Sequence, residues 1–260
     1  LTCAAAPLLF LRRNRGPIAG PPRALGEWRW MLLLGLVDAL NVGCFFGAMA
    51  RTTVAVAVLT HYLAPLFVAI AAPWVLATAR RTSTELLAGV GVVGLALVLE
   101  PWRTRAGLDA ARSWEGAALG ATSAVFYAAN VLITKRMGTR FTAVEQLVYH
   151  SVVSAIVLAV AAIVGGASLP SLDAAARVAI AGAGIGAVAG LLFLRGLARI
   201  PAEQASMLTF LEPLTAVCVG WSYWHESQAP MALVGGLIVL AAGAATVLST
   251  ANSPSPSTSS

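Results

Sequence analysis

The chain has 260 residues, of which 58% are hydrophobic and only 11% are charged. Soluble domains carry roughly 25% charged residues, so this composition excludes an ordinary soluble fold and predicts a protein that lies in lipid. The net charge of +6 does not indicate nucleic-acid binding, because the basic residues lie in short loops between apolar runs and form no patch with aromatic residues.

Apolar runs recur along the whole chain. The first, over 1–11, is about half the length that a bilayer requires, and we interpret it as the end of a helix whose beginning is absent. The remaining runs predict eight complete spans. They cover 28–50, 54–78, 85–99, 116–133, 142–164, 174–197, 202–224 and 231–248. The predicted fold class is therefore an all-α integral membrane protein with eight complete helices and a partial first one.

The longest polar connector divides the chain into two halves. It covers 101–115, between a first half over 1–100 and a second half over 116–249. Residues 250–260 are rich in Ser, Pro and Thr and are expected to be disordered.

Two of the expected spans, 54–78 and 202–224, resemble each other. When Pro65 is aligned with Pro213, seven of 22 positions are identical at a constant offset of 148 residues. Five spans separate the starts of the two copies, so the copies must cross the membrane in opposite directions. We therefore predict an inverted repeat of five transmembrane helices, which is a known arrangement of transporters.

The distribution of basic residues predicts the orientation. Twelve lie on one side and five on the other, and the positive-inside rule makes the richer side cytoplasmic. The C-terminus is then cytoplasmic as well. The richer side holds Arg12, Arg13, Arg15, Arg23, Arg29, Arg80, Arg81, Lys135, Arg136, Arg140, Arg195 and Arg199.

The residues around the second proline resemble a known family. Leu211 to Glu226 read LEPLTAVCVGWSYWHE, and a helix containing Gly235 and Gly236 follows a short polar turn. This pattern resembles the ninth helix of EamA-type permeases of the drug/metabolite transporter superfamily, and the stretch over 61–65 resembles their fourth helix. The resemblance covers nearly the whole chain. It implies ten helices in two inverted repeats around a central cavity, in a multi-pass protein of the cell membrane, with the first helix and most of the second outside this sequence.

Charged and amide side chains inside the apolar spans are candidate site residues, because a charge at mid-bilayer costs roughly 2.5–3.5 kcal/mol. Asp38 lies near the centre of the 28–50 span, and Asn41 lies three residues on, on the same helix face. The pair either lines a transport cavity or forms a structural hydrogen bond. Glu212 either contacts substrate or holds its own helix in place.

Two prolines and a histidine mark candidate helix breaks. Pro65 and Pro213 each remove a backbone donor inside a span. Broken helices often line transport sites, but plain kinks are also common in membrane helices. His61 lies about one turn before Pro65 and is either a cavity residue or a packed histidine.

Two spans carry polar stripes at helical spacing, which must face protein or water. Each stripe is either a cavity wall or a hydrogen-bonded seam between helices. Stripes next to the absent helices are expected to be exposed. The first consists of Ser123, Tyr127, Asn130 and Thr134, and the second of Gln146, His150 and Ser154.

The sequence predicts a secondary transporter that moves a small-molecule metabolite, in the export direction, by alternating access. If transport is coupled to protons, only the titratable Asp38, His61, His150 and Glu212 qualify. The alternative is a membrane sensor or assembly protein. No catalytic pair, phosphate loop or metal pattern is present, so no enzyme activity, cofactor or metal is expected. We expect the protein to be surrounded by lipid and to bind no nucleic acid. The sequence leaves both a monomer and a homodimer as alternatives.

Overall fold

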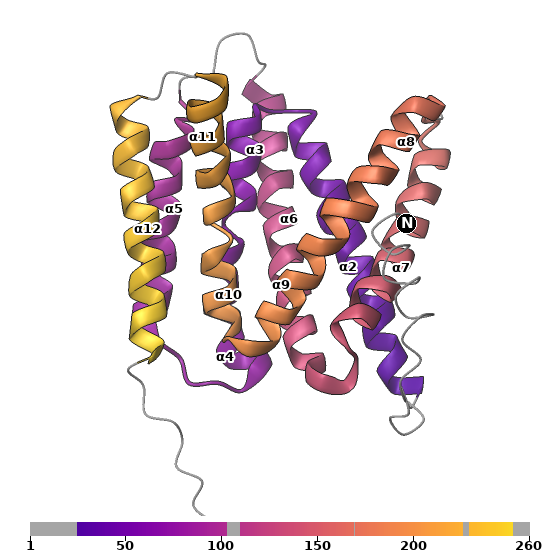
Figure 1. Ribbon diagram of the computed structural model, residues 1–260, viewed down its shortest axis with the longest axis horizontal. Helices are drawn as coiled ribbons and strands as arrows, with labels where there is room; N and C mark the ends of the chain where they lie inside the picture. Colours follow the sequence, from indigo (N-terminus) through magenta and orange to yellow (C-terminus); the bar gives the residue numbers. More distant parts are fainter. Residues whose placement is uncertain (1–24, 103–109, 169, 226–228, 252–260) are drawn as a thin grey trace, which may run out of the picture.

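The computed structural model describes residues 25–102, 110–168, 170–225 and 229–251. Within these ranges the chain is built of helices and contains no strand. Most of the helices run side by side, up and down the bundle (Figure 1). The predicted all-α class is confirmed. The predicted partial helix over 1–11 and residues 252–260 of the predicted tail lie outside the described residues.

The first half forms three crossings of the bundle. The second of them is interrupted at Tyr62 and Leu63, where one helix ends and the next begins. Pro65 lies in the first turn of that next helix, where a missing backbone N–H costs nothing. The helices are α2 (Leu25–Met49), α3 (Val54–His61), α4 (Ala64–Leu76) and α5 (Thr82–Leu99).

The second half forms five crossings, two of which are interrupted. One changes to a π-helical turn near its middle, and the other breaks at Thr209 and Phe210. The segments are α6 (Ala110–Met137), the 3-10 helix η1 (Gly138–Arg140), α7 (Ala143–Val164), α8 (Leu172–Ala181), the π-helix η2 (Gly182–Gly186), α9 (Ala187–Arg199), α10 (Ala202–Leu208), α11 (Leu211–Trp224) and α12 (Pro230–Ala251).

Seven segments among the described residues are long and apolar enough to cross a membrane. The remaining predicted span, 202–224, consists of the shorter α10 and α11. The predicted boundary at Gly116 is wrong, because α6 begins at Ala110 and includes part of the predicted connector. The chain is therefore a multi-pass membrane protein whose helices closely follow the predicted spans.

The crossing that breaks at Tyr62 and the crossing that breaks at Phe210 run in opposite directions. In Figure 1, α3 lies above α4, whereas α10 lies below α11. The end of α4 and the end of α6 lie at the same end of the bundle, since Arg136 Nη1 donates to the backbone oxygen of Val75 over 2.7 Å. An inverted repeat requires both relationships.

Glycines allow two helices from different halves to pack with their backbones close together. α5 packs along α12. A Cβ atom added to Gly94 would lie 2.9 Å from the backbone oxygen of Gly235. Small residues at such a crossing favour helix association in lipid, where the hydrophobic effect does not drive it.

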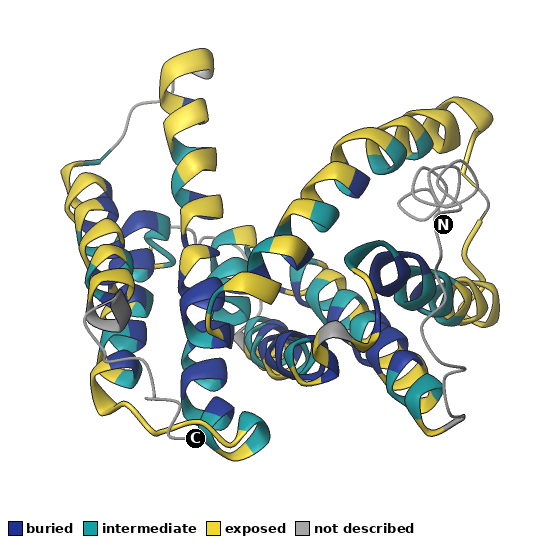
Figure 2. Cartoon of the chain, turned by 60° about the horizontal axis from the view of Figure 1, so that its bottom comes forward, coloured by how far each residue is buried: buried dark blue, intermediate teal, exposed yellow. Residues whose placement is uncertain are grey.

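The polar stripes are buried, and the expectation that they would be exposed is wrong. Ser123 is fully buried, and Thr134, Gln146 and Ser154 are nearly so. The other members, Tyr127, Asn130 and His150, are half-buried. Among the described helices, α8 is exposed over almost its whole length (Figure 2).

Candidate functional site at the two helix breaks

The two helix breaks meet inside the bundle. Tyr62 follows the last residue of α3, and Phe210 precedes the first residue of α11. Their rings stack with centroids 6.0 Å apart and planes inclined at 27°. These two residues are also equivalent at the 148-residue offset, so corresponding positions of the two similar segments are in contact.

A hydrogen bond joins the same two breaks. The Tyr62 hydroxyl donates to Oε2 of Glu212 over 2.7 Å. Glu212 is the second residue of α11, where the positive end of the helix dipole favours a carboxylate. Its side chain is exposed, so the carboxylate is held by Tyr62 and is open to a ligand.

His61 lies beside this pair and is bonded to another helix. Its Nδ1 lies 2.5 Å from the Ser123 hydroxyl oxygen on α6. Its ring contacts Phe45 and Tyr127, with centroids 4.7 Å and 5.3 Å away. His61 is therefore packed against aromatic rings and also lies beside the Tyr62–Glu212 pair, so it fits both predictions, a packed histidine and a cavity residue.

Tyr127 completes the group, since it is half-buried and its ring contacts that of His61. We call this group the polar cluster. It brings together side chains from α2, α3, α6 and the α10–α11 break. Its members are Phe45, His61, Tyr62, Ser123, Tyr127, Phe210 and Glu212.

The α6 stripe continues into a second polar contact. Asn130 Nδ2 lies 3.4 Å from Asp38 Oδ1 on α2, which is a long hydrogen bond. Asn41 is 9% exposed, and its Oδ1 has no hydrogen-bond partner among the described residues. The α6 stripe therefore acts as a hydrogen-bonded seam at Ser123 and at Asn130.

His150 takes no part in the polar cluster. Its Nδ1 bonds the backbone oxygen of Gln146 on its own helix. The Gln146 side chain in turn donates to the backbone oxygen of Phe141 over 3.0 Å. This second stripe fastens the turn between α6 and α7. Of the predicted site residues, the structure brings together His61, Tyr127 and Glu212, with Asp38 and Asn130 further along the same α6 stripe.

A family comparison decides what kind of protein carries this cluster. The EamA-like transporter family model matches residues 1–100 and 114–248. The chain belongs to the EamA-like transporter family. An uncharacterized transporter of Archaeoglobus fulgidus is 28% identical over 242 residues, which cover 89% of this chain and 83% of that protein. A solved crystal structure matches with a TM-score of 0.77 at 17% identity, over 95% of this chain and 85% of that one, and shows the fold alone.

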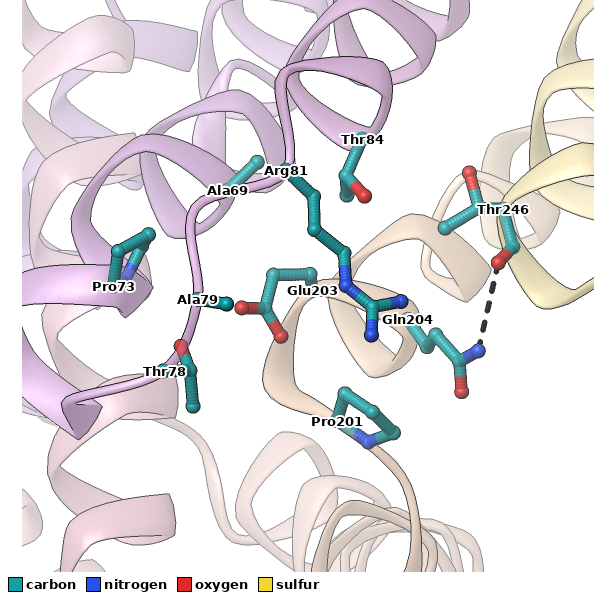
Figure 3. Close-up of a pocket in the computed structure, with 10 residues that line it drawn as sticks. All are labelled: Ala69, Pro73, Thr78, Ala79, Arg81, Thr84, Pro201, Glu203, Gln204 and Thr246. Atoms are coloured by element: carbon teal, nitrogen blue, oxygen red, sulfur yellow. Dashed lines mark hydrogen bonds between the residues drawn. The ribbon is translucent and has the colours of Figure 1, made fainter. Parts of the chain in front are cut away.

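This EamA-family chain also has a polar pocket at the end of the bundle where α4 ends and α10 begins. Its volume is about 140 Å³, and both halves line it. Figure 3 shows Arg81 extending toward Glu203 and Gln204 of α10. Gln204 Nε2 lies 3.5 Å from the backbone oxygen of Thr246 on α12. The pocket forms a polar opening at the end that the charge distribution predicts to be cytoplasmic.

Sequence reasoning missed the aromatic members of the polar cluster. In an apolar span, Phe45, Tyr62 and Phe210 are typical of packing residues. The repeat carried a usable signal, because Tyr62 and Phe210 occupy equivalent positions three residues before Pro65 and Pro213. The pocket residues Arg81, Glu203 and Gln204 gave no such signal, since each lies at a helix end that the sequence marks only as polar.

Proposed function

We propose that this EamA-family transporter is a secondary transporter that exports a small metabolite by alternating access. The observation that carries the proposal is the hydrogen bond from Tyr62 to Glu212, which joins the helix break of one half to that of the other. Interrupted helices near the middle of a bundle are typical of transport sites, because their free ends can bind a polar ligand.

The cluster suggests how a substrate would be held. Glu212 is exposed and accepts a hydrogen bond, so it can accept another from an N–H or O–H group of the substrate. The rings of Phe45 and Tyr127 pack against His61 in the same cluster, and aromatic rings there favour a substrate with an apolar or cationic part. Export by alternating access would require the Tyr62–Glu212 bond to break as one half rocks against the other.

The orientation and the repeat belong to the same proposal. The opposed directions of the two interrupted crossings support an inverted repeat (Figure 1). The bond from Arg136 to Val75 supports placing the basic ends of α4 and α6 on one side, which we assign to the cytoplasm. A cytoplasmic C-terminus follows from this assignment, and the cell membrane as location is part of the same proposal.

Proton coupling is part of the proposal for the titratable residues near the cluster. His61 and Glu212 lie in it, and Asp38 bonds the α6 stripe, whereas His150 bonds only its own helix. Flux of labelled metabolites in proteoliposomes, with and without a pH gradient, tests the coupling. Flux that is unaltered by the gradient removes the coupling and leaves a facilitator.

A matched pair of variants tests the transport function itself. Glu212→Gln should lower flux at unchanged expression, while Asp173→Asn, an exposed carboxylate on α8, should leave flux unchanged. Substrates would first be found by a thermal-shift screen of metabolites. A protein that binds none of them and moves none of them would instead be a sensor or an assembly partner.

A further inference from the structure

A basic pocket lies where the first turn of α2 meets the end of α6, away from the polar cluster. Its volume is about 230 Å³. Three arginines and one glutamate line it, which gives a formal charge of +2. We call it the arginine pocket. It is lined by Glu27, Arg29, Trp30, Arg136, Met137, Arg140 and Phe141.

The single carboxylate does not neutralise the arginines. Glu27 lies 3.9 Å from Arg140, which is a loose ion pair, and the Arg140 side chain is 61% exposed. Arg29 and Arg136 both lie over the Trp30 ring, with guanidinium carbons 6.0 Å and 5.9 Å from its centroid. Trp30 thus holds two guanidinium groups, and the only carboxylate among the described residues that line the pocket, Glu27, pairs with Arg140 instead. Guanidinium groups that line one pocket are suited to bind a phosphate, since each offers several N–H donors.

An apolar groove lies next to the arginine pocket. On α2 its residues lie level with those of the pocket, whereas on α7 they begin at Val148, about two turns further into the span than Phe141. Its volume is about 340 Å³. Trp28 of the groove contacts Phe141 of the arginine pocket edge-on, with centroids 5.5 Å apart. The two cavities therefore adjoin. The groove is lined by Trp28, Met31, Leu32, Val148, Tyr149, Val152 and Val153, from α2 and α7.

We propose that the arginine pocket and the apolar groove together bind one anionic phospholipid, with its phosphate at the arginines and an acyl chain along α2 and α7. The order of the two cavities matches the depth of a lipid, since a headgroup lies at the membrane interface and its chain lies deeper. A free phosphate would leave the groove empty. The chain's own preceding residues are poor occupants of the arginine pocket, because 12–23 carry four arginines and no acidic residue.

The test uses the purified full chain in detergent and follows its thermal unfolding. Phosphatidylglycerol should raise the melting temperature more than phosphatidylcholine with the same acyl chains, and inorganic phosphate should not reproduce the rise. The double variant R29Q/R140Q removes two charges and keeps Arg136, which also bonds Val75. It should weaken the apparent affinity for phosphatidylglycerol about tenfold or more, since each arginine near an anionic lipid contributes about 1 kcal/mol.

Three further variants separate the parts of the site. V152W fills the groove and should also weaken phosphatidylglycerol binding, whereas R177Q, on the exposed α8, should not. R29K/R140K keeps the charge and should retain most of the binding. Native mass spectrometry of the folded variants counts bound lipid directly, so a variant with a lower melting temperature still gives a result.

Three outcomes would overturn the proposal. Equal stabilisation by phosphatidylglycerol and phosphatidylcholine would show that the arginines do not select an anionic headgroup. Equal effects of inorganic phosphate and phosphatidylglycerol would show a free-anion site. Unchanged lipid counts in both R29Q/R140Q and V152W would place any bound lipid elsewhere on the molecule.

Discussion

Tyr62 and Glu212 lie 150 residues apart in the chain, yet a hydrogen bond of 2.7 Å joins the hydroxyl of one to the carboxylate of the other. Both residues lie at helix breaks, and the breaks belong to crossings that run in opposite directions (Figure 1). A bond at this place connects the two halves where a rocking motion would separate them. Its loss should therefore affect transport more than folding.

Tyr62→Phe tests that bond without disturbing the packing. The ring would still stack on Phe210, but Glu212 would lose a donor. We expect flux to fall about fivefold at unchanged expression, because a hydrogen bond to a charged group contributes about 1.5–3 kcal/mol when buried and less at an exposed site. Tyr149→Phe, outside the polar cluster, is the control. Equal losses in both variants would contradict a special role for Tyr62.

The α5–α12 crossing makes a prediction about stability. Gly94→Ala would place a Cβ atom 2.9 Å from the backbone oxygen of Gly235, and we expect destabilisation of about 1–3 kcal/mol. Gly89→Ala, on the same helix, meets nothing within 4 Å and is the matched control. It should be neutral or slightly stabilising, since alanine favours a helix over glycine. Thermal unfolding in detergent measures both, and a Gly94→Ala protein as stable as Gly89→Ala would refute the close crossing.

Lys135 should hold the end of α9 in place. Its ammonium group donates to the backbone oxygens of Leu197 and Ile200, each over 2.7 Å. Lys135→Met removes both bonds and keeps most of the apolar stem, so we expect a loss of about 1–3 kcal/mol of stability. Faster hydrogen exchange confined to α9 and the following turn would locate the effect there. Unchanged exchange in that turn would show that the ammonium group is dispensable.

The number and order of the helices could be predicted from the sequence, because an apolar run of a given length has few other structures available in lipid. The breaks at Tyr62 and Phe210 could be anticipated from Pro65 and Pro213, each of which lies in the first turn after a break. The π-helical turn over Gly182–Gly186 carries no proline and was not anticipated. The start of α6 at Ala110 could not be predicted from the sequence. The polar residues before Gly116 have the composition of a loop, but they belong to the helix.

The contacts between polar side chains were harder to predict. Helical spacing placed Ser123, Tyr127 and Asn130 on one face, but it did not say which helix that face meets. The structure shows that it meets His61 of α3 and Asp38 of α2. His150 has the same spacing relative to Gln146, yet it bonds its own helix. Rotation and packing of helices decide such contacts, and one sequence carries little information about either.

Labelling of a single cysteine tests alternating access around Glu212 most directly. Thr215 is exposed on α11 one turn beyond Glu212 and so lies on the same face. In a chain whose three native cysteines are replaced by serine, Thr215→Cys should react with a membrane-impermeant maleimide in both right-side-out and inside-out vesicles. Leu237→Cys, exposed on the apolar α12, should react in neither. Reaction of Thr215→Cys from one side only, or from neither side, would contradict the proposed pathway.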